Sequence, residues 1–350
     1  MSLVYFLPIL LIYLFGLINL FGIRPDLVTT SLMHFGIGIA FFFVIRYLQM
    51  HKHFFRSNAS FFYVFSLILL IITFFFGMDI KGSRRWLDLY IFPLQTSEIF
   101  KVFFIVFLST IFAKVYNPIE NGRLFLKTLM LTLLPFFFIY KQPDLATSII
   151  VFGIFFVMAL HSSIPKRHIM IFLLILLCLL PVAWIAMHDY QKARILSFMD
   201  PEHDTSGTSY NMVQANIAVG SGNLFGKGLG LGKQSQLSFL PEYHTDFAFS
   251  SLVEQFGFIG GFIVIFLYII FFLFVFIQMF RHMHGRDYDE QYSFYYLLGF
   301  SVMMIVQTAV NIGMNLGIVP IAGITLPFVS YGGSSMITFM IAMALIPPKQ

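Results

Sequence analysis

The sequence has little charge and almost no cysteine. Only 11% of its 350 residues are charged, against about 25% in a typical soluble domain. A chain this apolar cannot cover its exterior with polar groups in water, which excludes a soluble globular fold. The one cysteine, Cys178, excludes an intramolecular disulfide and a cysteine metal cluster. No basic face with interleaved aromatic residues is present, so the formal charge of +5 does not indicate nucleic-acid binding.

What the sequence has in abundance is apolar runs of membrane-spanning length. Hydrophobic residues make up 59% of the chain, including 47 phenylalanines, and a spanning helix needs about 20 mostly apolar residues. We therefore predict a single-domain (1–350), all-α polytopic membrane protein with about ten transmembrane helices. The predicted spans are 3–22, 27–48, 60–78, 95–115, 124–140, 145–161, 169–187, 250–280, 292–313 and 322–346. The first lacks a basic leader and a cleavage site, so we expect it to be retained as a helix.

The longest polar segment, about 188–249, separates the seventh and eighth predicted spans. Lysine and arginine are more frequent in the segments that share a side with the N-terminus, which favours cytoplasmic termini and an extracytoplasmic loop. Near the end of this loop, Glu242, His244 and Asp246 form a compact acid–base cluster. Asp246 directly precedes an apolar run, so two interpretations remain open: a helix N-cap or a functional carboxylate at the membrane surface. The spacing does not establish a metal site.

Polar residues also interrupt the predicted spans. Gln95, Glu98 and Lys101 recur every three residues, which places them along one side of a helix. Buried charges in a span are costly unless paired or hydrated. We therefore predict a Glu98–Lys101 ion pair, which either ties helices together or lines a polar cavity. Asp144 is expected to cap a helix.

Arg84 and Arg85 offer planar contacts to a phosphate or a local pair with Asp88. The adjacent Trp86 is either a residue of the interfacial aromatic belt or part of the site.

Glycines recur between residues 220 and 232 without the spacing of a nucleotide-binding loop. They indicate close backbone approach and unusual dihedral angles, and Lys227 among them is either an exposed lysine or a pyrophosphate contact. Irregular segments from Asn311 to Pro320 and from Leu326 to Ser335, including Ser330, interrupt the last two spans. Broken helices occur at membrane depth where they line a cavity or are buried in protein. These features alone also fit a transporter.

Five motifs together resemble those of the SEDS family (shape, elongation, division and sporulation), and most closely its RodA branch. They are Lys81-Gly82-Ser83-Arg84-Arg85-Trp86-Leu87-Asp88, Gln95-Thr96-Ser97-Glu98-Ile99-Phe100-Lys101, Gln142-Pro143-Asp144-Leu145, Phe239-Leu240-Pro241-Glu242-Tyr243-His244-Thr245-Asp246-Phe247 and Pro327-Phe328-Val329-Ser330-Tyr331-Gly332-Gly333. They span about residues 80–335 in the family's order. The departures are Thr96, where the family usually has proline, and Gln255, where a second glutamate often follows Glu254.

The resemblance implies a peptidoglycan glycosyltransferase of the bacterial inner membrane that polymerises lipid II with inversion, releasing undecaprenyl pyrophosphate. It maps the family's essential aspartate onto Asp246 and implies a class B penicillin-binding protein as partner. We expect Arg85, Arg194 and Lys227 to contact the diphosphate. The residues expected to form the supporting polar cavity are Trp86, Gln95, Glu98, Lys101, Asp144, Glu242, His244, Thr245 and Ser330. No cofactor is expected, and a divalent cation such as Mg²⁺ stays an open alternative. The other interpretations are a lipid II flippase, a non-catalytic scaffold or a division-specific paralogue of the FtsW type.

Overall fold

The structure, a computed structural model, describes residues 6–80, 82–89, 92–114, 121–187, 189–199 and 208–347. A helix corresponds to each predicted span: α1 (Phe6–Ile23), α2 (Val28–Lys52), α4 (Ala59–Phe76), α5 (Thr96–Lys114), α6 (Asn121–Lys141), α7 (Leu145–His161), α8 (Lys166–Ala186), α12 (Ala248–His282), α13 (Tyr288–Asn315) and α14 (Gly333–Ala344). Seven helices in the described ranges are long and apolar enough to cross a membrane, and α7 and α14 are shorter apolar helices. The polytopic membrane fold is thus confirmed, while the count of ten spans stays a prediction.

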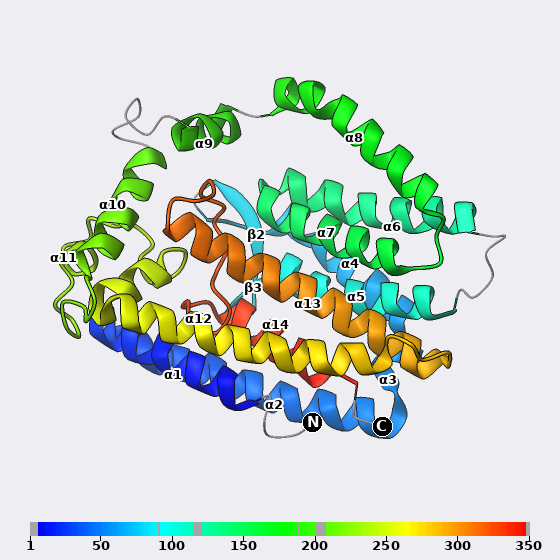
Figure 1. The fold of residues 1–350 in the computed structure, drawn as a ribbon, viewed down its shortest axis with the longest axis horizontal. Helices are drawn as coiled ribbons and strands as arrows, with labels where there is room; N and C mark the ends of the chain where they lie inside the picture. The colour runs from blue at the N-terminus through cyan, green and yellow to red at the C-terminus, as the bar shows by residue number, and fades with distance from the viewer. Residues whose placement is uncertain are drawn as a thin grey trace.

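Helix α5 lies at the centre of the bundle and packs against α4, α7, α13 and α14 (Figure 1). Apolar side chains on all sides of α5 are buried, for example Phe100, Val102, Phe103 and Ile105, and only Ile99 and Ile111 among them are partly exposed. A helix that is apolar all round is stable in a core or in lipid, but not at a water-facing surface. The outer helices leave many large apolar side chains exposed, among them Phe43, Phe76 and Ile185, as expected where lipid is the surrounding solvent.

Helix α8 extends along one edge of the molecule, apart from the other long helices (Figure 1). The chain then continues through α9 (Asp189–Met199), α10 (Thr208–Ser221) and α11 (Lys233–Gln236) at the end of the bundle where α12 begins. This segment is the predicted long loop, and its described residues include these three helices. Two further short helices, η2 (Pro25–Leu27) and α3 (Phe54–Ser57), lie next to α2.

A small three-stranded antiparallel sheet adds to the helical fold. It consists of β1 (Met78–Ile80), β2 (Ser83–Asp88) and β3 (Pro93–Gln95), in that order. Trp86 pairs with Met78 on one side and with Gln95 on the other. Gln95 is therefore a strand residue, and the prediction that it shares a helix side with Glu98 and Lys101 is wrong, because α5 begins only at Thr96.

Helix α12 contains a break at Gly257, where φ is +70°. The segment 223–228 supplies the hydrogen bonds that the break removes from the helix. The N–H groups of Phe258 and Ile259 donate to the carbonyls of Asn223 (2.8 Å) and Leu224 (3.2 Å). Conversely, the N–H groups of Lys227 and Gly228 donate to the carbonyls of Glu254 and Gln255. A Cβ on Gly226 would lie 2.0 Å from the Gln255 carbonyl oxygen, which confirms the prediction of close backbone approach in the glycine-rich segment.

The chain between α13 and α14, residues 316–332, is irregular. The last predicted span is thus helical only from Gly333 onward, which agrees with the expected interruption. Helix α14 packs against α2 and α5. Within the irregular segment, residues 324 and 326–330 are buried, whereas Leu316 and Ile318 are exposed.

Candidate active site

A cavity of about 710 Å³ lies where the sheet, the chain before α12 and the irregular segment before α14 meet. Seven residues proposed from the sequence line it: Arg85, Trp86, Gln95, Arg194, Glu242, Thr245 and Asp246. Because these residues come from four separate segments of the sequence, the fold brings together side chains that sequence proximity alone could not place. A volume of this size is within the range of about 300–1,000 Å³ that is common for small-molecule sites.

The two carboxylates of the cavity lie on one short turn. Glu242 has a φ of +53°, an uncommon conformation for a residue other than glycine. Its carbonyl accepts hydrogen bonds from the N–H groups of Thr245 and Phe247, both at 3.1 Å. Its carboxylate accepts from the Thr245 hydroxyl at 2.9 Å. Glu242 is therefore held in place by the turn that carries Asp246.

Asp246 does not cap α12, so that interpretation is wrong. The N-cap is Phe247, and the N–H of Ser250 in the first turn donates to Oδ1 of Asn315 at 2.9 Å. The amide groups of Asn311 and Asn315 both donate to the Asp246 carbonyl, at 2.9 and 3.0 Å. The main chain of Asp246 is thus fixed to α13, and its half-buried side chain faces the cavity.

The Asp246 carboxylate lies against Gly323 of the irregular segment. A Cβ on Gly323 would stand 3.5 Å from Oδ2 of Asp246, and this glycine has a φ of +63°. The N–H of Tyr331 donates to the carbonyl of His244 at 2.8 Å, which ties the two segments together again. The carboxylate turn and the chain leading into α14 therefore form adjoining walls of one cavity.

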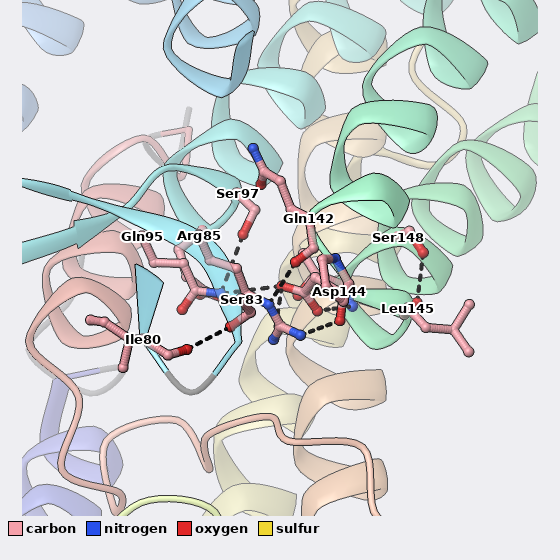
Figure 2. A network of polar contacts seen from close by, with 12 residues as sticks. Ile80, Ser83, Arg85, Gln95, Ser97, Gln142, Asp144, Leu145 and Ser148 are labelled. Carbon is pink, nitrogen blue, oxygen red and sulfur yellow. Dashed lines mark hydrogen bonds and ion pairs between the residues drawn. The ribbon is translucent and has the colours of Figure 1, made fainter. Parts of the chain in front are cut away.

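Arg85 is engaged by the turn between α6 and α7 (Figure 2). Its Nε donates to the carbonyl of Gln142 at 3.0 Å, and its Nη2 donates to the carbonyl of Pro143. Its Nη1 lies 3.7 Å from Oδ2 of Asp144, whose side chain is only 3% exposed. Asp144 in turn accepts a hydrogen bond from Gln95 at 3.2 Å. Asp144 thus offsets the charge of Arg85 directly behind the cavity wall.

The predicted cap at Asp144 is confirmed, because its Oδ1 accepts the N–H of Thr147 in the first turn of α7 at 3.1 Å. The alternative local pair of the arginines with Asp88 stays a prediction. Arg84 lies 3.7 Å from Asp79, and both of these side chains are exposed. Trp86 lines the cavity from β2.

The predicted Glu98–Lys101 pair is present and fully inside the protein. Nζ of Lys101 lies 2.7 Å from Oε1 of Glu98 and donates to Oε1 of Gln307 on α13 at 2.9 Å. Lys101 is 0% and Glu98 3% exposed. Neither residue lines the cavity, so the structure favours the helix-tying interpretation over the cavity-lining one.

The remaining predicted residues lie outside the cavity lining. His244 contributes its carbonyl behind the wall, and the Ser330 hydroxyl accepts the N–H of Leu326 at 2.8 Å. Lys227 is exposed on the segment that fills the break in α12. No group of three or more His, Cys, Asp or Glu side chains suited to a metal ion occurs within the described ranges.

Sequence reasoning missed several residues of the site. His34 of α2 lines the cavity, and a histidine inside an apolar predicted span was the available signal. Asn315 and Gln307 hold the site through contacts with residues far away in the sequence, which local patterns do not reveal.

Taken together, the fold and site define a polytopic membrane protein with a polar cavity formed by irregular backbone and a carboxylate-bearing turn. The chain belongs to the FtsW/RodA/SpoVE family of cell cycle proteins, whose family model matches residues 1–348. It is 35% identical over 302 residues to the peptidoglycan glycosyltransferase MrdB of Escherichia coli (strain K12), covering 85% of this chain and 79% of that protein. It is 32% identical over 317 residues to the probable peptidoglycan glycosyltransferase FtsW of Thiomicrospira cyclica, covering 89% and 79%.

Solved structures show the same fold. A chain from a peptidoglycan synthase complex that coordinates polymerization and crosslinking matches with a TM-score of 0.81 and 27% identity, covering 98% of this chain and 95% of that one. The rod shape determining protein RodA of Thermus thermophilus matches with a TM-score of 0.71 and 25% identity, covering 99% and 95%. The family assignment made from the sequence motifs is thus confirmed.

Proposed function

We propose that this protein is a peptidoglycan glycosyltransferase that polymerises lipid II during cell elongation. The observation that carries the proposal is the Asp246 carboxylate, which faces a cavity of about 710 Å³ while its backbone is fixed to α13. The relatives named as peptidoglycan glycosyltransferases support the reaction class. The higher identity to MrdB than to FtsW supports the elongation role.

In the proposed reaction, Asp246 acts as the general base. The acceptor's 4-hydroxyl transfers its proton to the Asp246 carboxylate as its oxygen bonds to the anomeric carbon of the donor. The bond between that carbon and the diphosphate oxygen breaks on the opposite face, and undecaprenyl diphosphate leaves with the electron pair. A carboxylate is ionised at neutral pH in its ordinary state, so Asp246 can accept the proton without prior activation.

The test is a polymerisation assay with purified protein and lipid II. Asp246→Asn keeps the shape of the side chain and the backbone contacts but removes its basicity. A positioned base typically contributes about 10²–10⁴-fold in rate, so we expect a loss of that size at normal expression and Tm. Asp287→Asn, which changes an exposed carboxylate beyond the far end of α12, should polymerise like the wild type. A well-folded Asp246→Asn protein with near-normal activity would remove Asp246 from the mechanism and point to Glu242.

The same assay separates the rival functions. Glycan strands indicate an enzyme, translocation of lipid II without polymer indicates a flippase, and neither indicates a scaffold. The proposed reaction uses no resident cofactor, so polymerisation should persist in EDTA. Activity that is lost in EDTA and restored only by Mg²⁺ would contradict this point.

The multi-pass protein is proposed to reside in the bacterial inner membrane with both termini in the cytoplasm. A reporter fused at position 207, which lies outside the described residues, should then be active only if it works in the periplasm or extracellular space. The proposed partner is a class B penicillin-binding protein, and the similarity to a chain from a peptidoglycan synthase complex supports it. Co-purification of the two proteins from detergent-solubilised membranes tests this pairing.

A further inference from the structure

The N-terminus of α14 faces the cavity without a side-chain cap. Gly332 is the N-cap residue, and no side-chain hydrogen bond caps the helix. Gly332, Gly333, Ser334 and Ser335 all line the cavity. The first regular bond of the helix runs from the N–H of Met336 to the carbonyl of Gly332 at 2.9 Å. The N–H groups of residues 333–335 have no acceptor in the part of the chain that the structure describes.

The two serine hydroxyls near these N–H groups are bonded to other segments. Ser334 donates to the carbonyl of Pro93 at 2.7 Å and accepts the N–H of Gln95 at 2.9 Å. Ser335 shares a hydrogen bond of 2.9 Å with Thr325. Because both side chains are turned to these partners, neither competes for the N–H groups at the start of the helix. The helix end keeps its free donors and its partial positive charge.

His34 provides a second, independent indication of a ligand. It lines the same cavity from α2 and is only 6% exposed. No hydrogen bond to its ring nitrogens occurs among the described residues, and these nitrogens are not among the fully buried polar atoms without a partner, so they stay accessible from the cavity. The ring packs directly on Gly333, where an added Cβ would lie 2.7 Å from Cε1 and Nε2 of the imidazole. A glycine is thus needed to bring His34 and the helix end together.

We propose that His34 and the N-terminus of α14 form the subsite that binds the diphosphate of the lipid-linked donor. The inference rests on the proposed glycosyl transfer, because that reaction supplies the ligand. Helix N-termini bind phosphate through aligned N–H groups and the helix dipole, and an imidazole adds a directional donor. The hydrogen bond between His244 and Tyr331 joins the carboxylate turn to the chain that enters α14. The acceptor's base and the leaving group's donors therefore lie on adjoining walls of the cavity.

This subsite adds to the basic side chains that the sequence suggested as diphosphate contacts, of which Arg85 and Arg194 line the same cavity. The charge of Arg85 is offset by Asp144 behind the wall, and Lys227 does not line the cavity. Backbone N–H groups bind a diphosphate without placing further cations inside the protein, where buried charges are costly. The helix end and the His34 imidazole therefore supply hydrogen-bond donors beside the arginines of the cavity.

The test is a binding measurement on the purified full-length protein in detergent, with undecaprenyl diphosphate, inorganic pyrophosphate and undecaprenol as probes. We expect the wild type to bind undecaprenyl diphosphate and, more weakly, pyrophosphate. His34→Phe should weaken binding of both by about tenfold or more, as for the loss of one hydrogen bond to a charged group. His284→Gln, at an exposed histidine beyond the far end of α12, should bind like the wild type.

A matched pair of variants tests the helix end itself. Ser335→Asp places a negative charge in the first turn, whereas Ser335→Asn has nearly the same shape without the charge. We expect the aspartate variant to lose diphosphate binding and the asparagine variant to retain it within a few fold. Equal binding by both variants, or by His34→Phe and His284→Gln, would overturn the subsite. Equal loss of undecaprenol binding in His34→Phe would also overturn it, because His34 would then contact the lipid chain. If the wild type binds diphosphate and His34→Phe weakens this binding, but the wild type does not polymerise lipid II, the proposed function is refuted and the subsite is retained.

Discussion

The buried ion pair between Glu98 and Lys101 gives the sharpest prediction on stability. Lys101 is fully buried, and its Nζ bonds only to Glu98 (2.7 Å) and Gln307 (2.9 Å) in the described part of the chain. Oε2 of Glu98 has no hydrogen-bond partner there. Breaking such a pair from one side leaves an uncompensated charge and typically costs about 3–5 kcal/mol. With an unfolding entropy of about 2.1 cal/mol/K per residue, this cost corresponds to a fall in Tm of roughly 4–7 °C for the whole chain.

The assay is thermal unfolding of the detergent-solubilised protein for Glu98→Gln, Lys101→Met and the double variant. Each single variant should show the full fall in Tm. The double variant should fall by clearly less than the combined shifts, because it contains no unpaired buried charge. Asp26→Asn serves as a control, since it breaks the Arg24–Asp26 pair, whose side chains are 39% and 58% exposed, and should change Tm little. Additive shifts in the Glu98–Lys101 cycle would refute the coupling.

Two further variants test the break in α12 and the hydrogen bonds from Arg85 to backbone carbonyls. Gly257→Ala should lower Tm and folded yield strongly, because the new Cβ would lie 2.3 Å from the Leu224 carbonyl oxygen at a residue with a φ of +70°. The control is Gly153→Ala, at a helical glycine with open space around it. Equal losses of Tm in the two variants would contradict the role of the helix break. Arg85→Lys should lower Tm more than Arg84→Lys, because a lysine at position 85 cannot keep the hydrogen bonds to both the Gln142 and the Pro143 carbonyl. Similar Tm values for the two variants would show that these hydrogen bonds contribute little to stability.

The membrane class, the spans and several site residues follow from the sequence because each depends on local properties. A long apolar run predicts a membrane-spanning helix without knowledge of the segments that pack against it. The Asp144 cap depends only on the residues that follow it. The Glu98–Lys101 pair also lies within one helical turn. Family motifs identified Asp246, which the structure places in the cavity.

The errors have one physical origin, which is contact between segments distant in sequence. The cap of α12 comes from Asn315 on another helix, so the local pattern at Asp246 suggested a cap that does not form. The period of three from Gln95 to Lys101 crosses the boundary between β3 and α5, and pairing with β2 determines where that boundary falls. His34 stood alone in an apolar run, and only the packing of α14 on α2 gives it a place beside Gly333.

The break in α12 explains how a polar loop is held rigidly at a membrane-embedded helix. Unsatisfied backbone groups are too costly in lipid, so irregular backbone is tolerated only where other protein groups bond to it. Here the segment 223–228 supplies both donors and acceptors to the break. Glu254, just before it, accepts the N–H groups of Gln234 and Ser235 at 2.8 and 3.2 Å. The loop is therefore fixed to the first turns of α12, and Asp246, two residues before this helix, is fixed with it. This arrangement gives the carboxylate a defined position relative to the N-terminus of α14, which the proposed transfer between two membrane-held substrates requires.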